Sequence, residues 1–219
     1  MGIRCRLCGS ADTSLFYSGE ARSHHREFHH CIACDLVFVP DSFLLDPAEE
    51  RERYLLHEND PAEEGYRAHL RNLLDEMTPL LEPGAEGLDY GSGDPPVLAM
   101  MLRERGFRVD CWDLLFSPDA AALERTYDFI TCSETAEHFR RPLLEFERFD
   151  RLLRPGGVLG VMTQMLDDWS HFGDWHYRFD ATHICFYSAR TMQWIAERFG
   201  WRASFPRQHV AIFRKGAGR

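Results

Sequence analysis

The chain has 219 residues, of which 44% are apolar and 27% are charged, and its formal net charge is −10. These values suit a globular protein with one core and a small appendage, and the negative charge argues against a general nucleic-acid binder. No apolar run reaches membrane-spanning length and the first residues are unlike a signal peptide, so we expect a cytoplasmic protein. The seven cysteines, an odd number, argue against a disulfide framework.

Two Cys-x-x-Cys pairs stand out in the first 45 residues, Cys5 with Cys8 and Cys31 with Cys34. Four thiolates complete a tetrahedral zinc site and leave no position for a catalytic water, so we expect structural Zn²⁺. A segment this short lacks a core of its own, and the metal would supply much of its folding free energy. A redox pair and reduced cysteines without metal remain as alternatives. The nearby histidines are weaker candidate ligands: His24, His25, His29 and His30.

Residues 46–64 are polar and acidic and indicate a linker. A helical pattern follows from about Pro61 and ends at Pro83-Gly84. We then expect strands at 87–90, 107–112, 127–132 and 158–165, helices at 97–105, 142–153 and 189–199, and a closing antiparallel pair at 201–205 and 209–213. Ser188 is the expected N-cap of the last helix. This alternation predicts an α/β fold with a mostly parallel sheet covered on both faces.

The stretch LDYGSGDPP, residues 88–96, joins the first of these strands to a helix through Gly-x-Gly. Such a turn lets backbone approach a ligand closely, and Asp113, about 20 residues beyond Gly93, is suited to accept ribose hydroxyls. Two acids flank the glycines, Asp89 and Asp94, and would repel a pyrophosphate but suit the cationic groups of S-adenosylmethionine. We expect Asp94 to cap the helix, with Pro95 at its first position. A purely structural turn is the alternative.

Three blocks, LDYGSGDPP, FRVDCWD and YDFITCSETAEHFRRPLLEFERFDRLLRPGGVLGV, resemble the signature blocks of class I S-adenosylmethionine-dependent methyltransferases. The resemblance runs from about Leu88 to the C-terminus and implies a Rossmann-like domain. It implies that the first block lines the methionine part of the cofactor, that Asp113 holds the ribose, and that Gly156-Gly157 forms a turn. The cofactor-binding residues predicted in this way are Asp89, Tyr90, Gly91, Ser92, Gly93, Asp113, Leu114, Ser133 and Glu134.

The sequence departs from that family between Asp113 and Tyr127. Only about a dozen residues, 114–126, stand where the family inserts a helix and a strand, which is too short for a full crossover. We therefore expect the edge strand beyond Asp113 to be missing. The usual acidic contact to adenine is then in doubt, and Asp119 or loop backbone is left to replace it.

The acceptor should lie beyond the C-terminal ends of the strands, near residues 133–141 and the long loop 165–187. Candidate general bases there are His138, His176 and His183, and a base is needed only for a hydroxyl or carbon acceptor. For His138 and His183 a structural role, orienting backbone or anchoring the loop, is an equally open interpretation.

These observations predict a zinc-ribbon-like module at 1–45, a linker at 46–64 and a methyltransferase domain at 65–219. The expected function is methyl transfer from S-adenosylmethionine to a small-molecule acceptor, without nucleic acid or membrane. An RNA-modifying methyltransferase and a non-enzymatic zinc and cofactor-binding module are the alternatives, and a nicotinamide oxidoreductase is a more distant one.

Overall fold

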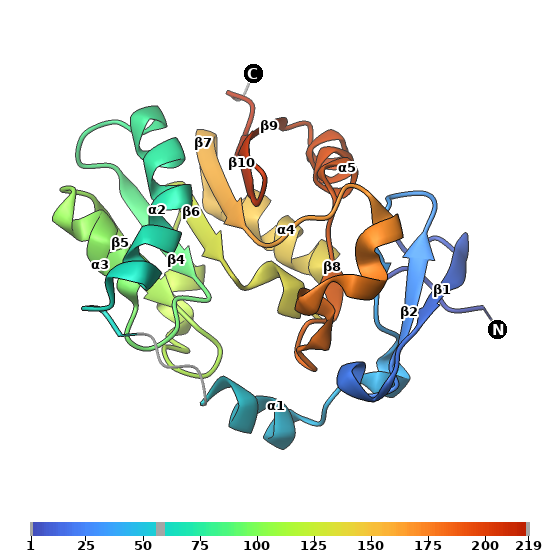
Figure 1. Cartoon of the computed structure of the whole chain (residues 1–219). Coiled ribbons are helices and arrows are strands. Elements are labelled where there is room, and N and C mark those ends of the chain that lie inside the picture. The colour runs from blue at the N-terminus through green and yellow to red at the C-terminus, as the bar shows by residue number, and fades with distance from the viewer. Residues whose placement is uncertain (1, 56–59, 218–219) are drawn as a thin grey trace.

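The computed structural model describes residues 2–55 and 60–217, and its main sheet has six strands in the order β5-β4-β6-β7-β10-β9 (Figure 1). The strands are β4 Glu86–Tyr90, β5 Arg108–Trp112, β6 Tyr127–Ser133, β7 Leu153–Met162, β9 Arg202–Arg207 and β10 Val210–Arg214. β4 pairs in parallel with β5 and β6, and β6 pairs in parallel with β7. β10 pairs antiparallel with β7 and β9. The predicted mostly parallel sheet with an antiparallel C-terminal pair is confirmed.

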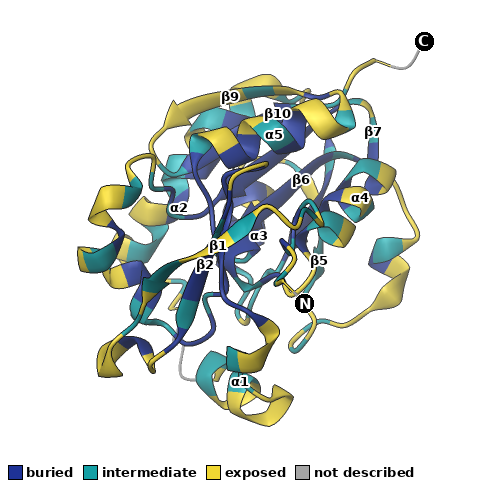
Figure 2. Cartoon of the chain, turned by 90° about the vertical axis from the view of Figure 1, so that its right-hand side faces the viewer, coloured by how far each residue is buried: buried dark blue, intermediate teal, exposed yellow. Residues whose placement is uncertain are grey.

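Helices cover both faces of this sheet, because each presents an apolar stripe to it. α2 Glu64–Met77 and α3 Val97–Glu104 pack on one face, with one buried cluster that includes Leu73 and Phe129. α4 Pro142–Leu152 and α5 Ala189–Phe199 pack on the other, with a second cluster that includes Phe146 and Ile195. Figure 2 shows the sheet between them as the buried centre of the molecule. Ser188 caps α5, as predicted: its side chain accepts a hydrogen bond from the Thr191 N–H.

The sheet ends at β5, so the predicted absence of a further edge strand is confirmed. Residues 114–126 are all described, and their only regular element is the short 3₁₀ helix η4 Ala120–Leu123. A single bridge between Asp113 and Ser117 closes a tight turn directly after β5. The chain then returns to β6, which leaves the carboxyl ends of β5 and β4 open at this edge.

Three local expectations were wrong: the cap at Asp94, the helix start at Pro95 and the turn at Gly156-Gly157. α3 begins at Val97, its N-cap is Pro96, which makes no side-chain hydrogen bond, and Asp94 is exposed. The residue before a proline avoids helical backbone, so Pro96 keeps Pro95 out of the helix and moves its start. β7 begins at Leu153, so Gly156-Gly157 belongs to an irregular strand start and not to a turn before it.

The segment 46–64, expected to be a linker, contains α1 Pro47–Tyr54. Asp46 caps this helix with hydrogen bonds from Ala48 and Glu49, in a capping box that the acidic composition concealed. The rest of that expectation includes residues 56–59, which lie outside the described residues.

A smaller sheet with the order β1-β2-β3-β8 carries the cysteine pairs. It comprises β1 Thr13–Ser18, β2 Glu27–Cys31, β3 Val37–Phe38 and β8 Cys185–Phe186. β8 comes from the far end of the chain and pairs antiparallel with β3. Figure 1 shows the blue N-terminal strands beside the orange segment that contains β8. One buried cluster continues from this sheet to α4 and α5, so the N-terminal segment packs as part of the whole. The boundaries 1–45, 46–64 and 65–219 stay a prediction.

In the described part of the chain, none of the helices combines the length and apolarity required to span a membrane.

Candidate active site and metal site

The glycine loop after β4 approaches the end of β6 without side chains in between. Gly91 and Gly93 have φ of +74° and +64°, the left-handed region in which a side chain adds strain. A Cβ on Gly91 would lie 2.3 Å from the Thr135 side chain. The N–H groups of Gly91 and Ser92 donate to the Trp112 carbonyl at 2.8 and 3.3 Å. The loop is therefore fixed, with its backbone at the open edge of the sheet.

Asp113 lies directly after β5 and ties two loops together. Its Oδ2 accepts a hydrogen bond from the Gly93 N–H at 3.0 Å. Its Oδ1 accepts from the N–H groups of Leu115 and Phe116 at 2.9 and 3.1 Å. A carboxylate offers about four acceptor positions, so this half-buried group retains capacity for a hydroxyl. The acid predicted to hold ribose is thus beside the glycine loop.

Asp89 lies beneath the loop and is only 2% exposed. Its Oδ1 accepts a hydrogen bond from the Thr131 hydroxyl at 2.8 Å, whereas Oδ2 has no hydrogen-bond partner among the described residues. Burial raises the pKa of Asp89 to about 6. The Thr131 hydroxyl and the Ala99 backbone offset only part of the effect of burial, and a cationic group beside the carboxylate would offset more of it.

Other predicted cofactor residues differ in what they can offer. The Tyr90 ring is 2% exposed and stacks on Trp112 at 4.4 Å, so the backbone of Tyr90 is the part left for a ligand. Ser92 is half-buried in the loop. Leu114 follows Asp113 in the turn and is 72% exposed, so its side chain is free to contact a ligand.

At the end of β6, Ser133 and Glu134 turn toward the same edge. Glu134 has φ +47°, a strained conformation for a residue with a side chain, and such strain concentrates at functional sites. Its N–H donates to the Met162 carbonyl at 2.7 Å, which holds the turn. The Ser133 hydroxyl is buried and has no hydrogen-bond partner among the described residues. Both residues therefore have side chains with binding capacity unused.

α2 adds two residues that sequence reasoning missed. His69 Nε2 lies 3.3 Å from a Glu134 carboxylate oxygen, and this hydrogen bond raises the pKa of His69. Burial, together with the charges of Asp89 and Glu134, raises the pKa of Tyr66 to about 12. Tyr66 lies one turn before Leu70, the first buried residue of α2, and His69 directly precedes it. Tyr66 is half-buried and His69 is exposed, so neither stands out from the apolar pattern of the helix.

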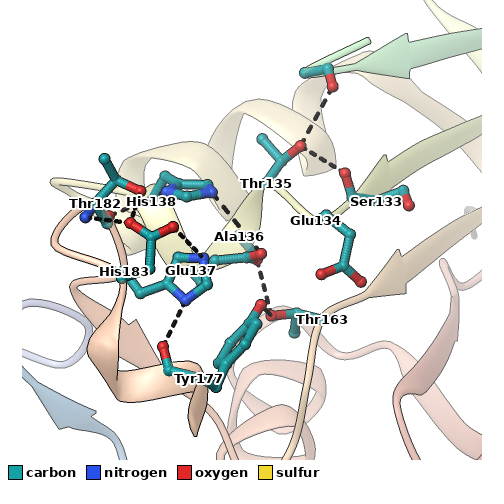
Figure 3. A network of polar contacts seen from close by, with 12 residues as sticks. Ser133, Glu134, Thr135, Ala136, Glu137, His138, Thr163, Tyr177, Thr182 and His183 are labelled. Atoms are coloured by element: carbon teal, nitrogen blue, oxygen red, sulfur yellow. Dashed lines mark hydrogen bonds and ion pairs between the residues drawn. The ribbon is translucent and has the colours of Figure 1, made fainter. Parts of the chain in front are cut away.

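A second group of polar residues lies on the acceptor side (Figure 3). His138 Nδ1 lies 3.0 Å from the Thr182 carbonyl, and His183 Nδ1 lies 2.8 Å from the Tyr177 carbonyl. A carbonyl only accepts, so each Nδ1 carries the hydrogen, and in the neutral rings each Nε2 has a free lone pair. The two rings are 4.9 Å apart. Burial lowers the pKa of His183, which favours its neutral form.

Glu137, also missed from the sequence, completes this group. It is 1% exposed, its Oε2 accepts a hydrogen bond from the Thr163 hydroxyl at 2.8 Å, and its Oε1 lies 3.9 Å from His138 Nε2. Thr163 also lies 3.1 Å from the Tyr177 hydroxyl. Figure 3 shows Glu137, His138 and His183 facing one another from η5 Ala136–His138 and the loop before β8. The predicted His176 is different: it is exposed on η7 His176–Phe179 and outside this network.

The four predicted metal-ligating cysteines are brought together. Cys5 Sγ lies 3.5 Å from Cys34 Sγ, Cys8 Sγ lies 3.4 Å from Cys31 Sγ, and all four sulfurs lie within 4.8 Å of one another. A tetrahedral ion with Zn–S bonds of about 2.3 Å requires sulfurs about 3.8 Å apart. The cysteines are free thiols, so the donor set and its spacing fit zinc.

Residues 62–203 match the family described as a methyltransferase domain, and the chain belongs to this family. Among solved structures, an O-methyltransferase family protein from Burkholderia thailandensis is similar with a TM-score of 0.52 and 17% identity, over 78% of this chain and 64% of that one. A 1,6-didemethyltoxoflavin-N1-methyltransferase from the same organism, solved with 1,6-didemethyltoxoflavin and S-adenosylhomocysteine, has a TM-score of 0.53 and 16% identity, over 85% and 98%. This chain spans less than two thirds of the first of these proteins. No curated protein sequence matches the chain.

The chain therefore has a methyltransferase domain by family and shares the fold of these methyltransferases, as the sequence predicted. The residues that contact the cofactor and the acceptor remain predictions.

Proposed function

We propose that the protein transfers the methyl group of S-adenosylmethionine to a small-molecule acceptor held between the glycine loop and the histidine pair. The observation that carries this proposal is the contact between Gly93 and Asp113. They are 20 residues apart in sequence, and the Gly93 N–H donates to Asp113 Oδ2 at 3.0 Å. This contact lies at the carboxyl edge of the sheet, where ligands of open α/β folds bind.

On the donor side, Asp89 would face the cationic part of the cofactor. When bound, S-adenosylmethionine supplies a methyl group on a sulfonium, which is already a good leaving group. The Asp89 and Glu134 carboxylates supply negative charge, which suits the cationic groups of this donor better than a diphosphate. Asp113 would hold the ribose, and Leu114 would cover adenine in place of the absent edge strand.

On the acceptor side, His183 would act as the general base and His138 would support it. The Nε2 lone pair of His183 can accept a proton, and the lowered pKa keeps the ring neutral at physiological pH. The carboxylate of Glu137 would then stabilise the positive charge that the histidine pair gains. These groups suit an acceptor hydroxyl or acidic carbon, which must lose a proton for transfer.

The acceptor is proposed to be a small molecule because the net charge of −10 opposes nucleic-acid binding. The similar Burkholderia enzyme crystallised with 1,6-didemethyltoxoflavin provides a precedent for such an acceptor on this fold. For the cysteine cluster we propose one structural Zn²⁺, held by Cys5, Cys8, Cys31 and Cys34.

Calorimetric titration with S-adenosylhomocysteine and with NADH tests the donor. We expect heat only with the former, and Asp113→Ala should weaken that binding about tenfold to a hundredfold through the lost charged hydrogen bonds. A protein that binds NADH and not S-adenosylhomocysteine would overturn the proposal.

The acceptor side is tested by following S-adenosylhomocysteine formation with a panel of phenols, carbon acids and amines. With an accepted substrate, His183→Ala should lower kcat about 100-fold to 10,000-fold and leave cofactor affinity unchanged. The variants His138→Ala and His176→Ala then rank the three predicted bases. Full activity of a folded His183→Ala variant would exclude the proposed base.

A further inference from the structure

Arg26, the residue directly before β2, is almost completely buried, with 2% exposure. Within the described residues, its guanidinium makes hydrogen bonds to five backbone carbonyls and to no side chain. The partners are Ser23 at 3.1 Å, Ala181 at 3.1 Å, His183 at 2.9 Å, Arg178 at 2.6 Å and Asp180 at 2.7 Å. All except Ser23 lie in residues 176–184, which we name the histidine segment.

Arginine is the residue that this arrangement requires. Its planar guanidinium has five N–H donors in a fixed fork, whereas lysine has three on one flexible atom. Ser23 accepts from Nε and anchors the fork on its own side of the interface. Nη1 and Nη2 then reach carbonyls that follow one another in the histidine segment, and they fix the path of its backbone.

The histidine segment in turn inserts an arginine, Arg178, into the N-terminal segment. Arg178, also 2% exposed, donates to Glu20 Oε1 at 2.9 Å and lies 4.7 Å from the centre of the Tyr17 ring. Glu20 and Tyr17 belong to the N-terminal segment, so each part of the structure places a buried arginine in the other. The long loop 165–187 is thus held in place by the N-terminal part of the structure.

His183 receives its orientation from this backbone. Its carbonyl accepts from Arg26, its N–H donates to the Asp180 carbonyl at 3.2 Å, and its ring Nδ1 donates to the Tyr177 carbonyl at 2.8 Å. The last bond determines which ring nitrogen carries the hydrogen. The side chain itself faces His138 across 4.9 Å and has Glu137 and Asp180 as its charged neighbours.

We propose that Arg26 is a positioning residue, through which the zinc-ribbon-like segment fixes the tautomer and orientation of His183. This inference rests on the proposed function only for what His183 then does. Arg26 itself needs no contact with cofactor or acceptor, and the N-terminal sheet becomes part of the acceptor site's construction.

The test is nitrogen NMR of the histidine rings in full-length protein labelled with ¹⁵N-histidine, at a pH of about 8, well above the lowered pKa of His183. Assignment by His183→Gln should identify a ring with the hydrogen on Nδ1 in wild type. Arg26→Ala should convert that signal to the exchange-averaged tautomer mixture of a free imidazole. Arg26→Lys, which retains fewer donors, should give an intermediate spectrum.

Arg6→Ala is the matched control. Arg6 is another arginine of the N-terminal segment, with a side chain that is 7% exposed, and it donates to the Val39 and Arg140 carbonyls and to Asp41, all outside the histidine segment. It should leave the His183 signal unchanged at equal zinc content. In Arg26→Ala, amide hydrogen exchange of residues 176–184 should rise about tenfold to a hundredfold, while affinity for S-adenosylhomocysteine stays within about twofold of wild type.

An unchanged His183 tautomer in a folded Arg26→Ala or Arg26→Lys protein would overturn the inference. If Arg26→Ala does not fold, the Arg26→Lys spectrum decides the question by itself. Failure of wild type to bind S-adenosylhomocysteine would instead overturn the proposed function and leave the tautomer result standing. Once an acceptor is known, Arg26→Lys should lower kcat about tenfold to a hundredfold with the KM for S-adenosylmethionine unchanged.

Discussion

Asp89 is the buried carboxyl group that we propose to face the cationic part of the cofactor. Its Oδ1 is occupied by the Thr131 hydroxyl, whereas Oδ2 is left without a hydrogen-bond partner among the described residues. Without a ligand, ionisation of this group is unfavourable, because burial raises its pKa to about 6 from an ordinary value of 3.8. A cationic donor would reverse that penalty, so the same residue disfavours the empty ionised site and favours the loaded one.

Asp89→Asn should therefore stabilise the cofactor-free protein at high pH. A carboxyl group with a raised folded pKa stabilises the fold at low pH, and this contribution is lost as the pH rises through about 6. At a pH of about 8 we expect the free energy of unfolding of the variant to exceed that of wild type by about 1–3 kcal/mol, with no difference near pH 4. Urea unfolding at both pH values measures it. A variant less stable than wild type at pH 8 would show that Asp89 ionises without penalty.

Gly91 is the residue of the loop for which substitution should be most damaging. Gly91→Ala combines a φ of +74° with a Cβ only 2.3 Å from the Thr135 side chain. Gly84→Ala is the matched control, because Gly84 has φ +75° and nothing within 4 Å of an added Cβ. We expect Gly84→Ala to cost about 1 kcal/mol and Gly91→Ala about 2–4 kcal/mol with loss of S-adenosylhomocysteine binding. Equal costs for the two variants would mean that the loop tolerates a displaced Thr135.

At the scale of elements, the turn after β5 replaces a helix and a strand. It leaves Leu114 72% exposed and Phe116 37% exposed at the edge where adenine is proposed to lie. An apolar side chain that is exposed in the free protein contributes to affinity when a ligand covers it. In the shortened sheet, an apolar turn therefore stands where the further edge strand is missing.

Leu114→Ala should weaken S-adenosylhomocysteine binding about threefold to thirtyfold without lowering the unfolding midpoint, because the side chain contacts little in the free protein. Leu144→Ala on α4, where the leucine is 47% exposed, is the control and should change neither quantity. Calorimetry and thermal unfolding on the same samples separate the two effects. Unchanged affinity in Leu114→Ala would place adenine elsewhere.

The sequence predicts elements of this chain better than it predicts their partners. The strands at 86–90 and 127–133 carry their own apolar and turn signals, so they and the missing edge strand could be anticipated. β8, with only Cys185 and Phe186, has no such signal, because it becomes a strand only by pairing with β3. For the same reason Arg26 was not anticipated: its partners are backbone carbonyls about 150 positions away, which no side-chain pattern records.

At the scale of the whole molecule, the N-terminal segment and the methyltransferase fold are built as one unit. β3 and β8 share a sheet, and Arg26 and Arg178 each donate hydrogen bonds from one part to the other. One buried cluster extends from Leu7 and Phe28 to the helices on the main sheet. Separate modules joined by a linker would unfold independently. Shared backbone pairing and a shared core instead couple the stability of one part to the other.

Removal of zinc should consequently destabilise the entire chain. Metal binding contributes several kcal/mol to a four-cysteine site, so chelation or Cys8→Ser should lower the midpoint of a single thermal transition by about 10 °C or more. The same loss should increase hydrogen exchange in residues 176–184, which Arg26 connects to the N-terminal sheet. Cys111→Ser is the control, since Cys111 lies on β5 outside the cluster, and it should retain one zinc per chain. Two separate transitions after chelation, with the second at the original midpoint, would contradict this coupling. They would mean that the N-terminal segment unfolds independently of the rest.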